Sequence, residues 1–384
     1  MPKKYSLALM VLLFLNACSP SNRPEVLNRT FDDLIDHLDS VSSWNGDISP
    51  PDIYLSDRFN IHLTTDSPVF EKQKLRIKNP TGPEPYPVSY SVIYKQHIIS
   101  LFESGKFSCI DINTFQRNRS FENRLNQLDS EYLWLLDGKL VAKSGLGHYV
   151  FNENDKWEPY DRYIPKAPQK ILFEDSSFLI SCDCYGEFGG TIYFYQKATQ
   201  ETYLTDAMCA RSIVLEDGAY KVLSSLGHGV GFSDLRLIPD PRKLTRLSDL
   251  DPFDLSPYQK QHLGFLDSTN YGESKFDFYS IQLFALFNHN RQHLYLTRWR
   301  GVTFITEIQG NTISVSDPLF ADNLYVHNPI STDYGNGLVL INLDFWGLGK
   351  DREVGMILIN GDKLTHIEWY NSKNPAHRKP KTGE

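Results

Sequence analysis

The chain has 384 residues, of which 41% are hydrophobic and 22% charged, which excludes a disordered chain and leaves enough apolar material for one large domain or two ordinary ones. The 24 glycines and 21 prolines are too few for a collagen-like or low-complexity protein. The formal net charge of −8 excludes a basic nucleic-acid-binding protein, so no nucleic-acid partner is expected.

The N-terminus carries the most specific pattern in the sequence. Two lysines precede an apolar run, Tyr5–Leu15, which is too short to cross a bilayer and is typical of a secretory signal peptide. The run ends in Leu15-Asn16-Ala17-Cys18, which resembles the lipobox of bacterial lipoproteins. The resemblance implies that residues 1–17 are removed and that Cys18 carries a diacylglycerol on its sulfur and a fatty acid such as palmitate on its amine. A free secreted protein with an unmodified Cys18 is the alternative.

The residue after the cysteine bears on the membrane that receives the protein. Ser19 follows Cys18 where some lipoproteins carry an aspartate, and this is similar to the outer-membrane class of Gram-negative lipoproteins. We therefore expect a lipid-anchored protein of the bacterial cell envelope, in the outer membrane, with its side of that membrane left open. Residues 18–50 are expected to hold the lipidated cysteine, a polar tether and a short helix at Phe31–Val41, and residues 371–384 a polar basic tail.

The segment between these ends reads as strands. Stretches such as Ile171–Cys182, Ser280–Arg300 and Gly337–Phe345 are rich in β-branched and aromatic residues and are interrupted at short intervals by Gly, Asp, Asn and Pro. Few stretches sustain a helical period. The sequence therefore predicts an all-β body over residues 51–370.

An internal repeat refines this prediction. Residues 135–150 (LLDGKLVAKSGLGHYV) and 215–230 (LEDGAYKVLSSLGHGV) are identical at eight of sixteen positions when they are aligned at an offset of 80. Eighty is twice the length of one blade of a β-propeller, about 40 residues. Turns followed by a strand recur at similar spacing, at Asp57, Lys95, Asp137, Asp175, Asp217, Asn290 and Gly335.

These units resemble the blades of β-propellers in general, without the sequence motif of a named blade type. A four-stranded unit cannot bury both of its faces alone, so such units stack around an axis. We expect a seven-bladed propeller; six blades are allowed, and eight would follow if a degenerate unit lies near Pro257–Phe278. A β-sandwich or a solenoid with a duplicated hairpin is the alternative architecture.

The repeat also predicts where a ligand would bind. In each unit the first turn and a later Gly-rich loop lie at opposite ends of one strand, so the later loops should share one face, and loops on a rigid scaffold commonly carry binding residues. The candidate ligand-binding residues on these loops are His148, Tyr185, Glu187, His228, Trp299, Arg300, Asp344 and Trp346. The alternative for the repeated His148 and His228 is a structural role, in which their side chains stabilise the packing of the blades.

The four cysteines beyond Cys18 allow disulfides in an exported protein. Cys182 and Cys184 lie two apart on one strand face, where a bridge between them is difficult, and Cys209 could pair with either. Reduced buried thiols are equally compatible with the sequence. A Cys-x-Cys metal site lacks the usual second pair of ligands, so neither a metal nor another cofactor is expected.

The sequence contains no HExxH, GxSxG, P-loop or kinase signature. The leading hypothesis is therefore an envelope-anchored, non-catalytic propeller that binds another envelope protein or a glycan. The alternative is a propeller-fold glycoside hydrolase or lyase, in which carboxylates on the loop face, Glu103, Asp183, Glu187 or Asp344, would act in pairs.

Overall fold

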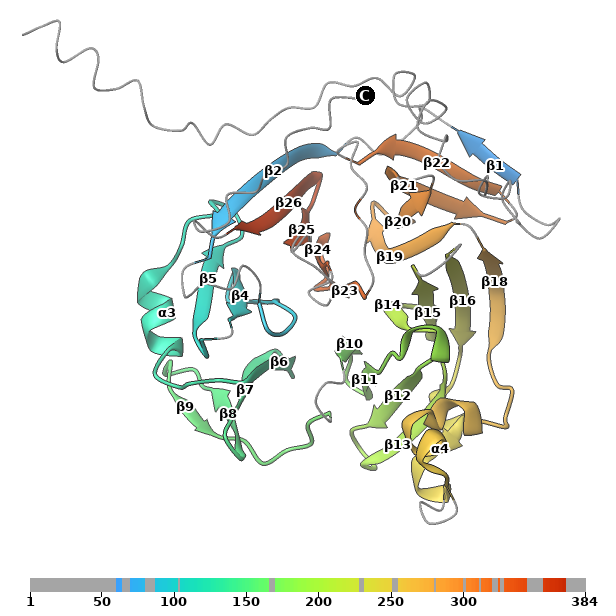
Figure 1. Cartoon of the computed structure of the whole chain (residues 1–384), viewed down its shortest axis with the longest axis horizontal. Coiled ribbons are helices and arrows are strands. Elements are labelled where there is room, and N and C mark those ends of the chain that lie inside the picture. Colours follow the sequence, from blue (N-terminus) through green and yellow to red (C-terminus); the bar gives the residue numbers. More distant parts are fainter. Residues whose placement is uncertain are drawn as a thin grey trace, which may run out of the picture.

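The computed structural model describes residues 60–63, 70–79, 87–102, 104–165, 170–227, 231–250, 255–279, 281–299, 302–310, 312–319, 324, 328–343 and 355–370. Cys18, the tether, the helix expected at Phe31–Val41 and the C-terminal tail lie outside these residues. The described strands form six sheets arranged around a central axis, as Figure 1 shows, and this is the arrangement of a β-propeller.

The first three sheets, or blades, follow the chain in order. Blade 1 consists of β3 (Val92–Tyr94), β4 (His97–Leu101) and β5 (Phe107–Asp111). Blade 2 consists of β6 (Tyr132–Leu136), β7 (Lys139–Ser144), β8 (Gly147–Phe151) and β9 (Trp157–Pro159). Blade 3 consists of β10 (Lys170–Glu174), β11 (Phe178–Cys182), β12 (Thr191–Gln196), β13 (Glu201–Asp206) and the short β17 (Thr245–Arg246).

Of the last three blades, blades 5 and 6 each add an outer strand from the N-terminal part of the described chain. Blade 4 consists of β14 (Ala210–Glu216), β15 (Ala219–Leu226), β16 (Phe232–Ile238) and β18 (Glu273–Tyr279). Blade 5 consists of β19 (Gln282–His289), β20 (Gln292–Trp299), β21 (Val302–Gln309), β22 (Thr312–Pro318) and β1 (Asn60–Leu63). Blade 6 consists of β23 (Ile330–Asp333), β24 (Leu338–Asn342), β25 (Gly355–Asn360), β26 (Lys363–Tyr370) and β2 (Glu71–Lys78).

Short helices occupy the connections. A two-turn helix, α3 (Arg119–Leu125), joins blades 1 and 2, and Asn118 caps its N-terminus by accepting the Phe121 backbone N–H. The other helical segments are η1 (Gly186–Phe188), η2 (Pro241–Lys243), η3 (Leu247–Asp249), α4 (Pro257–Gln261) and η4 (Leu263–Leu266). None of the helices in the described ranges is long and apolar enough to cross a membrane.

The expectation of an all-β propeller is confirmed, whereas the favoured count of seven blades is wrong. The segment expected to form the unit before Lys95 supplies β1 and β2, which pair in parallel with β22 and β26 at the outer edges of blades 5 and 6. The region near Pro257–Phe278 is an insertion into blade 4 that contains α4, η4 and the outermost strand β18, and so it adds no eighth blade. The turn expected at Asp57 lies outside the described residues.

The repeated turns join the first and second strands of the blades. At Asp137-Gly138 both residues have positive φ, 48° and 65°, and at Asp217-Gly218 the values are 51° and 76°. Such left-handed pairs make the two-residue hairpin whose twist matches that of the flanking strands, which is why Asp-Gly recurs at this place in the repeat. We refer to the ends of the blades that carry these hairpins as the tip face.

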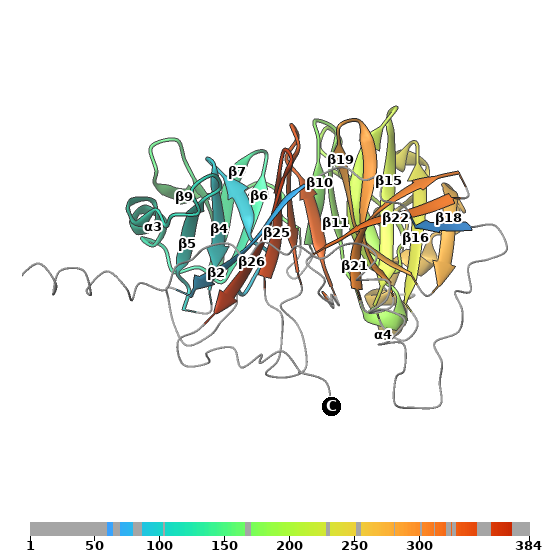
Figure 2. The same cartoon turned by 90° about the horizontal axis from the view of Figure 1, so that it is seen from above.

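Polar contacts between neighbouring blades run around the whole tip face. They are the pairs Lys95–Asp155 (2.9 Å), Asp137 N–Glu174 (2.7 Å), Tyr220–Asp175 (2.6 Å), His293–Glu216 (2.7 Å), His289–Asp362 (3.4 Å) and Asn360–Asn113 (3.4 Å), which join blades 1–2, 2–3, 3–4, 4–5, 5–6 and 6–1 in turn. The first hairpins of blades 1 to 5 lie at or beside these contacts. In blade 6 the Gly361 N–H donates to the Gly337 carbonyl oxygen at 3.0 Å, which places its first hairpin beside the same circuit, so the hairpins lie on one face of the ring. The turns between second and third strands therefore lie on the other face. Figure 2 shows the ring from its edge, with α4 on this second face.

The core is divided into six apolar clusters, and each of them lies between two neighbouring blades. The cluster between blades 3 and 4, for example, joins Phe194 and Ile213, and the cluster between blades 5 and 6 joins Phe284 and Ile357. The cluster between blades 2 and 3 is the smallest, with Trp134, Leu136, Val141 and Leu179 fully buried. Since each blade buries its faces only against its neighbours, the ring is the unit that is stable.

Candidate functional site

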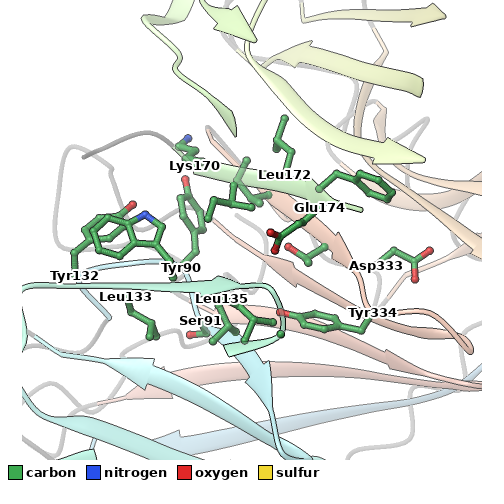
Figure 3. A pocket seen from close by; sticks show the side chains of 17 residues that line it. Tyr90, Ser91, Tyr132, Leu133, Leu135, Lys170, Leu172, Glu174, Asp333 and Tyr334 are labelled. Carbon is green, nitrogen blue, oxygen red and sulfur yellow. The ribbon is translucent and has the colours of Figure 1, made fainter. Parts of the chain in front are cut away.

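A cavity of about 220 Å³ lies on the axis of the ring and is the candidate functional site. Its walls are the innermost strands of blades 1, 2, 3 and 6, which are β3, β6, β10 and β23, together with the residues beside them. Lys170, Glu174 and Asp333 are its charged lining residues (Figure 3). Aromatic walls come from Tyr90, Tyr132, Trp134, Phe173 and Tyr334.

The cavity extends from the axis toward blades 1 and 2, because the six innermost strands are not evenly spaced. Strand β23 of blade 6 contacts β19 of the adjacent blade 5, and it also contacts β14 of blade 4 and β10 of blade 3. Blades 3 to 6 therefore pack together across the axis. The space that remains lies on the side of blades 1 and 2, whose β3 and β6 form the opposite wall. Hence the cavity is lined by four blades, and blades 4 and 5 contribute none of the lining residues.

One end of the cavity is bordered by a contact across the ring. The Lys170 ammonium lies over the Tyr90 ring, 5.2 Å from its centroid, which joins blade 3 to the segment that enters blade 1. The Tyr90 hydroxyl donates to the Asn328 carbonyl oxygen at 3.1 Å, and Asn328 leads into β23. This end of the cavity is therefore built from three blades and carries a positive charge.

The other end, at the tip face, carries a carboxylate. Glu174 is the last residue of β10, and its two oxygens accept bonds from the Asp137 backbone N–H and from the Lys197 ammonium, at 2.7 and 2.8 Å. Burial raises the pKa of Glu174, although these two bonds oppose the rise. Lys197 also bonds Asp137 at 2.7 Å and thereby lowers the pKa of that carboxyl group. The network holds the Glu174 side chain in one position at the cavity wall.

Two further side chains from blade 6 complete the lining. The Tyr334 hydroxyl accepts the Ile93 backbone N–H at 2.9 Å, and burial raises the pKa of Tyr334. Asp333 accepts the Gly335 backbone N–H at 2.8 Å, which fixes its carboxylate at the turn after β23. Figure 3 shows Asp333 and Glu174 coming from different strands on the same side of the cavity.

Three of the predicted ligand-binding residues are described, and they lie outside the lining of this cavity. His148 is on β8, where its ring packs against Trp134 with centroids 5.9 Å apart and its carbonyl oxygen accepts the Tyr160 N–H. Tyr185 and Glu187 are on the connection between β11 and β12, and the Tyr185 ring packs on His262 at 4.8 Å. None of the three is among the cavity-lining residues.

The remaining predicted residues are not described at the level of side chains. Trp299 is the last residue of β20, at the end away from the tip face, and only its backbone is described. His228, Arg300, Asp344 and Trp346 lie outside the described residues, as does Glu103. Asp183, a candidate acid of the glycosidase alternative, accepts the Thr191 N–H and the Tyr193 hydroxyl, and burial raises its pKa.

The cysteines near this loop differ in state. Cys184 and Cys209 form a disulfide that ties the β11–β12 connection of blade 3 to the start of blade 4. Cys182 is a buried thiol whose pKa is raised by burial to about 12, and Cys109 is also buried and free. Within the described ranges, no three His, Cys, Asp or Glu side chains are grouped to hold a metal ion.

A buried arginine lies beside the disulfide. Arg211, on β14, is fully buried, and its guanidinium donates to the Ser225 carbonyl oxygen at 2.9 and 2.7 Å and to Asn328 Oδ1 at 2.7 Å. The Cys184 sulfur lies 3.1 Å from the same Asn328 oxygen. Asn328 thus connects the disulfide, the buried arginine and the Tyr90 end of the cavity.

The cavity residues were missed by sequence reasoning for a definite reason. Reasoning from the repeat directed attention to the loops, whereas the cavity is lined by the innermost strands. The only local signal is in β10, Lys170-Ile171-Leu172-Phe173-Glu174, where an apolar strand begins and ends with opposite charges. Chemically, the cavity offers aromatic faces, one ammonium and two carboxylates, a set that suits a small polar ligand.

Comparisons with known proteins show likeness of shape without family membership. No family model matches the chain, and no curated protein matches it in sequence. Solved structures that resemble it include the N-terminal domain of Nup159, with 8% identity over 80% of this chain and 84% of that one and a TM-score of 0.36. BamB from Moraxella catarrhalis is 10% identical over 66% of each chain, with a TM-score of 0.31.

A further similar structure is the extracellular domain of the putative hybrid two component system BT4673 from B. thetaiotaomicron. It is 16% identical over 80% of this chain with a TM-score of 0.35, and the chain spans 36% of its length. All three TM-scores are low. The propeller assignment therefore rests on the six sheets and the six clusters between them.

Proposed function

We propose that this chain is a lipoprotein of the bacterial cell envelope, anchored in the outer membrane through Cys18, whose propeller is a non-catalytic binding module. The lipobox Leu15-Asn16-Ala17-Cys18, followed by Ser19, supports the anchor and its address. The axial cavity, walled by four blades, supports binding of a small polar ligand or of a polar group on an envelope protein.

The single observation that carries the non-catalytic assignment is how the polar groups of the cavity are held. Both Glu174 oxygens accept structural bonds, the Tyr334 hydroxyl accepts a backbone N–H, and the Lys170 ammonium lies on the Tyr90 ring. A group used in this way is positioned for contact with a ligand, whereas an acid or base must exchange its proton during each turnover.

The anchor is tested on the protein purified from a bacterial membrane. Mass spectrometry of the N-terminal peptide should show a triacylated Cys18 as the first residue, and Cys18→Ala should leave the precursor uncut and unlipidated. Sucrose-gradient fractionation should place the wild type in the outer membrane and Ser19→Asp in the inner membrane. An unmodified Cys18 at the mature N-terminus would refute the anchor.

The binding site is tested by thermal shift with panels of monosaccharides and dipeptides. A compound that raises the melting temperature should lose its effect in Lys170→Met and Asp333→Asn. Lys143→Met is the matched control, because Lys143 pairs with the half-exposed Glu131 at 2.6 Å and lies outside the cavity lining. Equal shifts in all three variants would place the ligand elsewhere.

A specific observation keeps the enzymatic alternative in view. Glu174 and Asp333 both line the cavity from different blades, and burial raises the pKa of Glu174, as in a general acid of a glycoside hydrolase. The alternative requires that an oligosaccharide is cleaved by the wild type and left intact by Glu174→Gln and by Asp333→Asn. Chromatography of the products decides between binding and cleavage.

A further inference from the structure

The face opposite the tip face carries a group of exposed apolar side chains. Leu146, at the turn between β7 and β8, is completely exposed. Phe188, on η1, is 59% exposed, and Tyr258 and Phe265, in the insertion of blade 4, are 55% and 53% exposed. We refer to these four residues as the apolar face. Large apolar side chains with this exposure commonly mark a contact surface when they gather on one side of a protein.

Three of the segments that carry these residues converge below blade 3. The η4 segment packs on the end of β13, so closely that a Cβ on Gly264 would lie 2.7 Å from the Asp206 Cα. The Phe265 ring packs on Gly189 in the β11–β12 connection, where a Cβ would come within 2.5 Å of the ring. The insertion is therefore docked against the turn that carries Phe188, at the end of the blade away from its tip.

Two of the rings, those of Tyr258 and Phe265, pack against a buried histidine. His262 is buried, and its ring contacts Tyr258, Tyr185 and Phe265 with centroids 4.4, 4.8 and 5.9 Å away. Cys184, which precedes Tyr185, is bonded to Cys209, and this disulfide fixes the turn to blade 4. Preorganised aromatic side chains lose little conformational entropy when they enter a contact.

Exposed charged residues of both signs flank two members of the apolar face in sequence. Glu187 and Lys260 are the exposed charged neighbours of Phe188 and Tyr258 in sequence, and they have opposite signs. A contact made here would therefore be dominated by apolar and aromatic groups and would depend little on ionic strength. Tyrosine and phenylalanine rings of this kind are favoured at the interface between lipid headgroups and acyl chains.

We propose that the apolar face rests on the surface of the bilayer that holds the lipid anchor, an inference that depends on the proposed lipidation of Cys18. The chain from Cys18 to Asn60 spans about 140 Å at full extension, so the tether lets any face of the ring reach the bilayer. The anchor keeps the ring at high local concentration beside that surface, which makes even a few exposed rings sufficient for contact. Leu146 and Phe188 protrude from turns of two neighbouring blades, which suits a flat lipid surface better than a groove.

The test uses the lipidated protein reconstituted in vesicles of phosphatidylethanolamine and phosphatidylglycerol. Leu146→Cys and Phe188→Cys are labelled with an environment-sensitive dye, and Leu215→Cys, at an exposed leucine of the tip face, is the matched control. The native thiols Cys109 and Cys182 are buried and do not compete for the dye. Unchanged melting temperatures show that the labelled variants are folded.

We expect brominated lipid to quench the dyes at positions 146 and 188 at least about twofold more than the dye at position 215. Equal quenching at all three positions, in protein that floats with the vesicles, would overturn the inference while leaving the anchor intact. Dyes that respond only after other envelope proteins are reconstituted would overturn it in favour of a protein partner. Protein that does not float refutes the anchor itself, before any dye is read.

Discussion

Reduction of the Cys184–Cys209 disulfide should destabilise the propeller by an amount that follows from its position in the chain. The bond closes a loop with a sequence separation of 25 residues. The chain-entropy relation for such a loop gives about 3.5 kcal/mol at 25 °C. For a domain of about 310 residues the entropy of unfolding is about 0.65 kcal/mol/K, so the melting temperature should fall by about 5 °C.

Calorimetry of the wild type with and without a phosphine reductant measures this fall, and Cys184→Ser/Cys209→Ser should reproduce the reduced value in the absence of reductant. Cys182→Ser is the control, since Cys182 is a free thiol and its variant should still respond to the reductant. Two thiols beyond Cys18 should be titratable in the unfolded wild type before reduction and four after it. Four thiols before reduction, or a melting temperature unchanged by the reductant, would refute the reasoning.

Three further predictions concern single positions. Gly190→Ala should lower the free energy of unfolding by at least about 2 kcal/mol, because its Cβ would lie 2.4 Å from a backbone oxygen. The Cβ of Gly138→Ala would meet no atom within 4 Å, so this variant should lose only about 1 kcal/mol, from its positive φ; urea titration of both variants measures the difference. Burial lowers the pKa of His366 to about 3, so below pH 6.5 the unfolded chain binds a proton that the folded chain does not. The free energy of unfolding should therefore fall by about 2 kcal/mol between pH 6.5 and pH 5, and His366→Leu should abolish that part of the pH dependence. Burial raises the pKa of Asp234, which also faces Asp277 on the adjacent strand, so ionisation of Asp234 destabilises the fold as the pH rises above the ordinary carboxyl range. Asp234→Asn should therefore raise the free energy of unfolding by about 0.5 to 1 kcal/mol at pH 7 and leave it unchanged at pH 3.

The features that could be predicted from the sequence are those set by local chemistry. The turns at Lys95, Asp137, Asp217 and Asn290 all join first and second strands, because positive φ at two successive residues is a local requirement that leaves a recognisable mark in the sequence. The prediction that the later loops share the face opposite these turns is confirmed for the loops after β7 and β11, which the structure describes in full.

The blade count depended on pairings that no local pattern reveals. Residues 71–78 lie within the unit expected between Asp57 and Lys95, yet β2 pairs with β26 at a separation of 292 residues. Similarly, the insertion before β18 looks like a degenerate blade in length and composition. Its segments are instead docked on blade 3, through the close approach of Gly264 to β13.

The candidate site was hidden for a related reason. Tyr90, Lys170, Glu174 and Asp333 become neighbours only because β23 leans across the axis toward β10 and leaves a space beside β3 and β6. That lean is a property of the closed ring, set by packing among four blades. Linear spacing between these residues, on three separate blades or their approaches, carries no trace of it.

The parallel pairing of β1 and β2 with the last strands of blades 5 and 6 has a consequence for biogenesis. Of the described strands these leave the ribosome first, whereas their partners β22 and β26 follow about 250 and 290 residues later. Such distant contacts carry a large loop-closure entropy. The ring therefore closes only after the whole chain is available. Until then β1 and β2 have no partner strands, and blade 1 exposes the apolar surface that it later shares with blade 6. The unclosed chain is therefore a natural client for chaperones.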